Sequence, residues 1–362
     1  MKNNPLLLIL IPCFFGCTDD VSNNANDSQY NSPDSLTMIQ EKIKAEDSLL
    51  DGLELKVSEI LRNRMISMSP RDSSSIGTDW SDSVEVIIVH ETRFGQHPKV
   101  DVTLSSEYVL IGGGADILEQ MIPGALLTAS YPDNNLSTWH AESKDHIFKF
   151  YHHLMGYAIG LKLKGLTRDD LLKHIKIYSK TSGSIQHPNT SVGVGDDYIL
   201  IGGGAKVNWD INLNSKGSLL VKSYPDQNMK VWYAEGKDHF LSNPSTITVY
   251  AIGIKKVIPN FGSLEISQES SSDAIQTGFD MVTVMIGDDW VVSCPGGKAE
   301  YAENDPDGFG RMLCGIVPSS ETVIVTSKDH MVQDDGETRA YAIKIRKKRG
   351  SGNSSGSGYP GN

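Results

Sequence analysis

Lys144-Asp145-His146 is followed, eleven residues after its histidine, by Tyr157-Ala158-Ile159. The same tripeptide and spacing occur twice more, at Lys237-Asp238-His239 with Tyr250-Ala251-Ile252 and at Lys328-Asp329-His330 with Tyr341-Ala342-Ile343. The lysines are 93 residues apart (237 minus 144) and 91 apart (328 minus 237). A fixed period of this kind is typical of a chain built from one repeated unit. Catalytic constellations are seldom built in triplicate, so the period argues against a single-site enzyme.

Other short sequences recur at the same period in the first two units. They are Ile111-Gly112-Gly113-Gly114-Ala115 with Ile201-Gly202-Gly203-Gly204-Ala205, Ser130-Tyr131-Pro132-Asp133 with Ser223-Tyr224-Pro225-Asp226, Gln96-His97-Pro98 with Gln186-His187-Pro188, and Trp139 with Trp232. The third unit has diverged, because it has Ser293-Cys294-Pro295-Gly296-Gly297 for the glycine run and Val323 for the tryptophan. Divergent terminal repeats are common in such arrays. We therefore expect units at residues 82–165, 173–257 and 264–347.

The units alternate apolar and polar residues with period two, as strands do. In the first unit the predicted strands are 84–89, 99–104, 108–111, 125–127, 138–141 and 156–161. Strands and helices do not alternate, which argues against a parallel α/β sheet. The helix signal between units is short, at 167–174, with Thr167 as its cap. We predict an all-β fold of three tandem repeats of about 90 residues, arranged as β-sandwiches or as one β-prism-like body with pseudo-threefold symmetry.

Both ends of the chain differ from this body. Residues 1–17 combine Lys2, an apolar stretch and Gly16-Cys17, which resembles a bacterial lipoprotein signal with Cys17 as the lipidated residue. Residues 18–35 and 350–362 contain little to bury, and we expect a disordered tether and a disordered tail. The chain would then be anchored by lipid in the cell envelope, at the surface of an outer membrane. An ordinary secretory signal is the alternative.

Residues 36–69 carry apolar side chains at steps of three and four, which predicts an amphipathic helix. Two interpretations remain open. The helix could form a short coiled coil that makes the protein a homo-oligomer, or it could pack on the first β unit.

Cys294 and Cys314 are the cysteines that remain once Cys13 leaves with the signal and Cys17 carries lipid. Two thiols in an oxidising compartment predict a disulfide. Closing a loop of about 20 residues would contribute about 3 kcal/mol.

The repeated tripeptide has two interpretations. Alternation places Asp145 on the core side with Trp139, so Asp145, Asp238 and Asp329 would hold a loop in shape, and Trp139 and Trp232 would be structural. In the other interpretation, the lysines and histidines point outward as ligand-binding residues. These candidates are Lys144, His146, Lys237, His239, Lys328 and His330.

Tyr131 and Tyr224 are further candidates, because an aromatic face beside Asn and Asp side chains suits a sugar ring. A tyrosine packed over a hairpin is the alternative. The glycine runs lack the lysine and helix of a phosphate loop, so they indicate a bulge or close packing on an aromatic ring. We find no motif for catalysis and expect no cofactor and no bound metal. A net charge of −12 without a basic stripe argues against nucleic acid as a partner.

The series Gly-Gly-Gly-Ala, Ser-Tyr-Pro, Trp, Lys-Asp-His and Tyr-Ala-Ile-Gly resembles a repeat of exported bacterial proteins. In such proteins it accompanies secreted enzymes or perforin-like toxins as an accessory β module, and the acidic residues after Cys17 resemble those of Bacteroidetes-type surface lipoproteins. The resemblance implies a non-catalytic binding or adhesion role, with a glycan or a cell-surface protein as partner. A structural lipoprotein that self-associates through its N-terminal helix is the alternative.

Overall fold

The computed structural model describes residues 74–120, 124–147, 149–209, 217–239, 242–275, 278–301, 311–330 and 336–349. All of these residues belong to one compact unit. The predicted signal (1–17), tether (18–35), helix (36–69) and tail (350–362) lie outside the described residues.

Within these ranges the chain is almost entirely β, as predicted, and its strands form three antiparallel sheets. Sheet I has the order β1 (Ser74–Thr78), β2 (Val84–Gly95), β7 (His152–Leu163), β4 (Val109–Ile117), β18 (Met312–Pro318), β19 (Thr322–Lys328), β16 (Phe279–Met285). Sheet II has the order β3 (Lys99–Thr103), β6 (Thr138–Lys144), β5 (Leu126–Pro132), β10 (Tyr198–Asn208), β13 (Thr246–Lys255), β8 (Ile175–Thr181). Sheet III has the order β14 (Val257–Ile258), β15 (Gly262–Ile275), β20 (Gly336–Lys347), β17 (Val291–Tyr301), β11 (Leu219–Pro225), β12 (Val231–Lys237), β9 (Asn189–Gly193).

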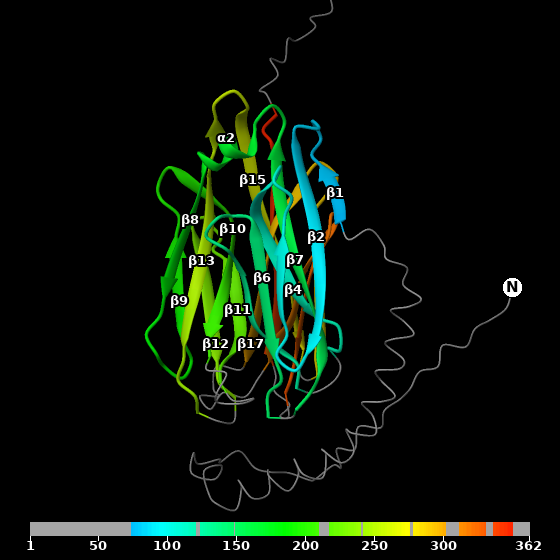
Figure 1. Cartoon of the computed structure of the whole chain (residues 1–362), viewed down its shortest axis with the longest axis vertical. Helices are drawn as coiled ribbons and strands as arrows, with labels where there is room; N and C mark the ends of the chain where they lie inside the picture. The colour runs from blue at the N-terminus through cyan, green and yellow to red at the C-terminus, as the bar shows by residue number, and fades with distance from the viewer. Residues whose placement is uncertain are drawn as a thin grey trace, which may run out of the picture. The chain divides into compact units, whose positions relative to one another are not determined.

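Each sheet combines strands from two different stretches of sequence. Residues 74–163 supply four strands to sheet I and three to sheet II, and the following stretches divide themselves between sheets in the same way. The last stretch closes the set, because β18 pairs with β4 from the first stretch. The strands run side by side along the long direction of the view (Figure 1). Three separate sandwiches would not share strands in this way.

The first-unit strands predicted from alternation all overlap strands of the structure. The short helix is also confirmed as α2 (Arg168–Leu172), where the Thr167 side chain accepts a hydrogen bond from the backbone N–H of Asp170. The acidic residues Asp169 and Asp170 lie in its first turn, where the helix dipole favours negative charge.

The glycine runs pack against tryptophan rings, as expected. A Cβ atom on Gly113 would lie 2.3 Å from Cδ2 of Trp139, and one on Gly203 would lie 2.3 Å from Cδ2 of Trp232. Each run also contains a register shift, for example between Leu110 and Gly112. Bare backbone at these positions therefore lets a large ring from the next sheet sit directly on the strand.

The predicted disulfide between Cys294 and Cys314 is wrong, because both cysteines are free and buried. Cys294 lies on β17 in sheet III and belongs to the large core, whereas Cys314 lies on β18 in sheet I within a separate apolar cluster. The two strands are consecutive in sequence but belong to different sheets, so they do not form the hairpin that a bridge would join. Burial raises the pKa of Cys294 to about 12 and that of Cys314 to about 11, which keeps both as unreactive thiols.

Candidate functional site

The three Lys-Asp-His segments lie at the ends of β6, β12 and β19, and their side chains are buried. Lys144, Asp145 and His146 have no exposed surface. Lys237, Asp238, His239, Lys328 and His330 are at most 5% exposed, and Asp329 is slightly more accessible. The expectation that these lysines and histidines point outward is therefore wrong. Strand alternation does not fix their direction, since the tripeptide lies where each strand ends.

The aspartates make the loop-holding contacts expected of them. Asp145 accepts a hydrogen bond from the backbone N–H of Phe150 (3.1 Å), and its other oxygen lies 2.7 Å from Nε2 of His97. Asp238 has the same two partners in Asn243 N–H (2.8 Å) and His187 Nε2 (3.0 Å). The repeated Gln-His-Pro sequence thus supplies the histidine that faces each buried carboxylate.

In the third segment an arginine takes the place of the histidine. Asp329 accepts from the backbone N–H of Gly278 (2.6 Å) and lies 3.6 Å from the Arg311 guanidinium, which is fully buried. Arg311 also donates to the Ser327 hydroxyl (2.9 Å). A buried carboxylate needs hydrogen-bond donors in every copy, and the residue type that provides them differs.

The three histidines of the tripeptides converge, although they come from segments more than 90 residues apart. Their ring centroids are 5.6 Å apart for His146 and His239, 5.1 Å for His146 and His330, and 5.2 Å for His239 and His330. His239 Nε2 lies 2.6 Å from the carbonyl oxygen of His330, and His330 Nε2 lies 3.1 Å from that of His146. The histidines thus link the ends of β6, β12 and β19, three strands that belong to three different sheets.

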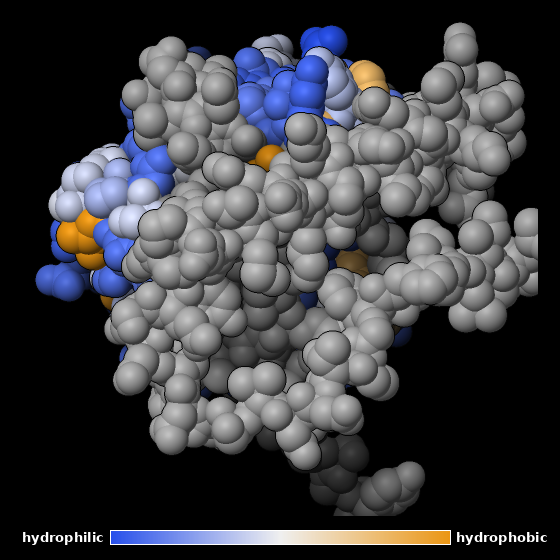
Figure 2. Space-filling model, turned by 90° about the horizontal axis from the view of Figure 1, so that it is seen from below, coloured by the Kyte–Doolittle hydropathy of each residue, from blue (hydrophilic) through white to orange (hydrophobic). Residues whose placement is uncertain are grey.

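Burial lowers the pKa of His146 and of His330 well below the ordinary value, and the neighbouring histidines lower it further. Burial also lowers the pKa of Lys144 to about 7. The Lys144 ammonium donates to the carbonyl oxygen of Gly217 (3.1 Å) and lies 4.6 Å from the ring centroid of Trp209. Among the described residues, no group of three or more His, Cys, Asp or Glu is arranged to hold a metal ion. In the view from below, the described surface around this end is mostly hydrophilic (Figure 2).

Tyr131 and Tyr224 lie elsewhere, each in the middle of a row of rings that crosses the outer face of a sheet. In sheet II, Tyr131 faces His140 on β6 (centroids 4.9 Å apart) and Tyr250 on β13 (5.3 Å). In sheet III, Tyr224 faces Tyr233 on β12 (5.5 Å) and Tyr341 on β20 (5.2 Å). We call these the sheet II row and the sheet III row.

A glycine makes each row possible. Gly204 is opposite Tyr250 in the register of β10 and β13, and Gly296 is opposite Tyr341 in the register of β17 and β20. Each glycine lies on the strand between two stacked tyrosines, and a Cβ on Gly204 would lie 2.8 Å from Cα of Tyr131. The absence of a side chain lets rings from strands that are not neighbours come into contact. Covering a sheet glycine with an aromatic ring is itself stabilising, so the central tyrosines also have a structural role.

The most exposed ring of the sheet III row is at its β12 end, whereas Tyr341 at the other end is buried. Tyr131 and Tyr224 have neighbours on both sides and are half-buried, whereas Tyr233 is 40% exposed. His140 ends the sheet II row, where its Nδ1 lies 2.6 Å from Asp101, and Ser191 on β9 is opposite Tyr233. The row ends therefore place an aromatic face beside hydrogen-bonding groups.

Sheet I has no such row. Val317 and Ile324 are paired across β18 and β19 as Tyr224 and Tyr233 are paired across β11 and β12. Sheet I keeps a tyrosine opposite a glycine, Tyr157 opposite Gly114, but its other two positions are aliphatic. Asp116 takes the place of Lys206 and Lys298 on the neighbouring strand, and burial raises its pKa to about 7.

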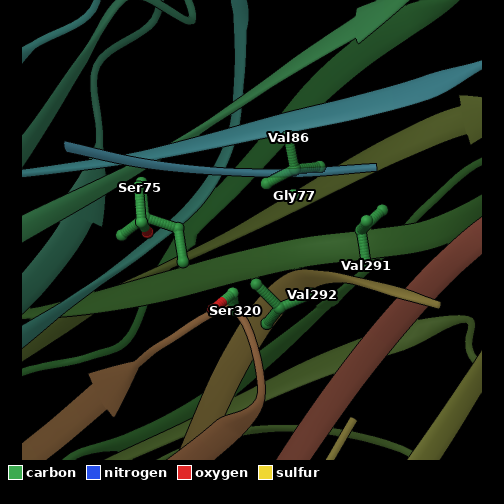
Figure 3. Close-up of a pocket in the computed structure, with 7 residues that line it drawn as sticks. Ser75, Gly77, Val86, Val291, Val292 and Ser320 are labelled. Carbon is green, nitrogen blue, oxygen red and sulfur yellow. The ribbon is translucent and has the colours of Figure 1, made fainter. Parts of the chain in front are cut away.

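Other candidates are weaker. His152 and His153 point to opposite faces of β7, since His152 is buried beside Ser143 Oγ (2.8 Å) while His153 lies 2.6 Å from Glu119. A small hollow between β1, β2 and β17 is lined by Ser75, Gly77, Val86, Ile88, Val291, Val292 and Ser320 (Figure 3). It presents no charged side chain, and we assign it no role.

Sequence reasoning found Tyr131 and Tyr224 but missed His140, Tyr233, Tyr250 and Tyr341 as their partners. The signal was available for two of them, because Tyr250 and Tyr341 begin the repeated Tyr-Ala-Ile. His140 and Tyr233 both follow a repeated tryptophan, but they differ in residue type and carry no common motif.

No family model matches the chain, and no curated protein matches it significantly. No helix among the described residues is long and apolar enough to cross a membrane.

Proposed function

We propose that this protein is a non-catalytic, lipid-anchored protein of the bacterial cell surface that binds glycans through its aromatic rows. The observation that carries the proposal is the sheet III row, whose terminal ring, Tyr233, is 40% exposed beside polar groups. Sugars present C–H faces that stack on aromatic rings, and hydroxyl groups that need donors and acceptors at the ring's edge. The signal-like residues before Cys17 support the anchor.

Binding is tested at Tyr233, because removing a half-buried central tyrosine would also disturb packing over a glycine. Losing one stacking face costs about 1 kcal/mol. Tyr233→Ala should therefore weaken binding on a glycan array and by titration about 5- to 10-fold, with an unchanged melting temperature. The matched control is Ile324→Ala, which changes the corresponding position of sheet I. Equal affinity of Tyr233→Ala and the unaltered protein would contradict this role of the row.

The anchor is tested separately. Cys17→Ser should abolish incorporation of labelled palmitate and move the protein from the membrane fraction to the soluble fraction, because the acyl chains supply the membrane affinity. Cys13→Ser is the control and should leave both unchanged. Labelled acyl chains on the Cys17→Ser protein would show that Cys17 is not the lipidated residue.

A further inference from the structure

The two aromatic rows are built to one plan. Tyr131 is opposite His140 across β5 and β6 as Tyr224 is opposite Tyr233 across β11 and β12. A lysine from the adjacent strand lies over each central ring, with Lys206 Nζ 5.1 Å from the Tyr131 centroid and Lys298 Nζ 5.5 Å from that of Tyr224. The rows share no residue and lie on different sheets.

Around each row, the positive and negative charges of the side chains balance one another. Beside the sheet II row, Lys206 and Lys99 both contact Glu142 (3.0 and 3.1 Å), and Asp101 faces His140. Two lysines therefore share the Glu142 carboxylate, and the Asp101 carboxylate faces a histidine, so the formal charges of the two lysines and the two acidic residues balance.

Beside the sheet III row, two lysines and an arginine meet three glutamates. Lys222 contacts Glu235 (2.8 Å), Lys298 pairs with Glu300, and Arg339 contacts Glu337 (2.6 Å). An anionic polysaccharide would have to break these pairs to find a cation, whereas a neutral sugar needs only ring faces and hydrogen bonds.

We infer that the two rows are separate sites of the same class and that one molecule holds two neutral glycan chains at once. This inference rests on the proposed glycan-binding function and adds to it the number of sites and the class of sugar. Sheet I does not provide a third site, because Val317, Ile324 and Asp116 replace the aromatic and basic residues. Two weak sites on one body bind a polymer surface more tightly than either alone when both can be engaged together.

The test is a titration of the full chain with mannohexaose, cellohexaose and xylohexaose as neutral probes, and with hexagalacturonate as the anionic probe. We expect a neutral probe to bind at two sites per chain. Its affinity should change less than twofold between about 50 and about 500 mM NaCl, over which the Debye length falls roughly threefold. Tyr233→Ala and His140→Ala should each weaken one of the two sites about 5- to 10-fold and leave the other unchanged, and the double variant should weaken both. Circular dichroism and melting temperature confirm that each variant is folded.

The outcomes separate the inference from the function on which it rests. Three outcomes overturn the inference while glycan binding stands: binding of hexagalacturonate alone, one site per chain in the unaltered protein, or equal weakening of both sites by either single substitution. Failure of all four probes to bind overturns the proposed function and the inference together.

Discussion

Gly112, Gly202 and Cys294 occupy equivalent positions, because each is opposite the isoleucine of a Tyr-Ala-Ile sequence in the strand register. Strands β4, β10 and β17 approach one another so closely there that a Cβ on Gly202 would lie 1.9 Å from the carbonyl oxygen of Ile111. A Cβ on Gly112 would lie 2.3 Å from the carbonyl oxygen of Ser293. The space accepts the side chain of Cys294 because the other two positions have none.

Gly202→Ala should therefore destabilise the protein by about 3 kcal/mol or more, since the clash is with backbone that cannot rotate away. Chemical denaturation followed by tryptophan fluorescence measures the loss. The control is Gly183→Ala, where a Cβ meets nothing within 4 Å, and which should change the free energy of unfolding by less than about 0.5 kcal/mol. Similar small effects of both substitutions would show that the three strands do not meet as closely as described.

At the level of strands, three residues that contact one another on β4, β5 and β6 are all of different types on the corresponding strands β17, β18 and β19. In the first unit, Trp139 packs on Gly113 and its indole N–H donates to the Ser130 hydroxyl (2.9 Å). Trp232, Gly203 and Ser223 repeat this arrangement, with a hydrogen bond of 3.0 Å. The third unit replaces all three types at once, with Val323, Pro295 and Ile316. A smaller side chain removes both the need for a bare strand and the need for a hydroxyl acceptor.

The third-unit residues should consequently be coupled. Val323→Trp alone should destabilise the protein by about 2 kcal/mol or more, because the ring meets the Pro295 side chain and its N–H has no acceptor. Adding Pro295→Gly and Ile316→Ser should recover part of that loss. A double-mutant cycle on the free energy of unfolding measures the coupling between Val323→Trp and the two other substitutions taken together, and we expect a coupling of about 1 kcal/mol. Strictly additive effects would mean that these positions change independently.

At the scale of the described molecule, three sheets are joined at one end by His146, His239 and His330. Among the described residues, neither ring nitrogen of His146 has a hydrogen-bond partner, although the side chain is fully buried. Such a site stabilises the fold only while the imidazoles remain neutral. A buried charge on His146 would be desolvated and would face two further histidines and Lys144.

Acid should therefore weaken the fold. The pKa values of His146 and His330 are well below 6.5 in the folded state, and burial lowers that of His152 to about 4. The unfolded chain, with ordinary histidines, takes up protons first as the pH falls below 6.5. Stability is thus fully present above pH 6.5 and is lost toward the folded pKa values, by up to about 1.4 kcal/mol per pH unit for each histidine.

Melting temperatures at about pH 7.5 and about pH 5 measure this loss, because these two pH values lie on either side of the ordinary histidine pKa of about 6.5. His146→Phe removes one of the three titrating groups and fills a similar volume, so the decrease in melting temperature should be smaller than in the unaltered protein. Equal melting temperatures at the two pH values would contradict the neutral, buried state of these histidines.

Much of the β structure could be predicted from sequence. Alternation located the first-unit strands, Thr167 marked the start of α2, and the glycine runs indicated packing on an aromatic ring. The functional candidates were predicted less well. Tyr131 and Tyr224 lie on outer faces, but the tripeptide lysines and histidines are buried. The alternation of residues along a strand indicates which side chains share a face of that strand. It carries no information about what covers the tripeptide where each strand ends and the loop begins.

The pattern of residues was enough to predict that the chain forms strands, where the strands of the first unit lie, and which short motifs recur at a period of about 90 residues. The three-dimensional arrangement was needed to show that consecutive stretches share sheets, that Cys294 and Cys314 lie in different sheets, and that three distant histidines meet. The physical reason is that a strand's hydrogen-bonding edges are nearly the same along any sequence. Which strand pairs with which is therefore settled by how the glycines, tryptophans and buried charges of the whole set pack together.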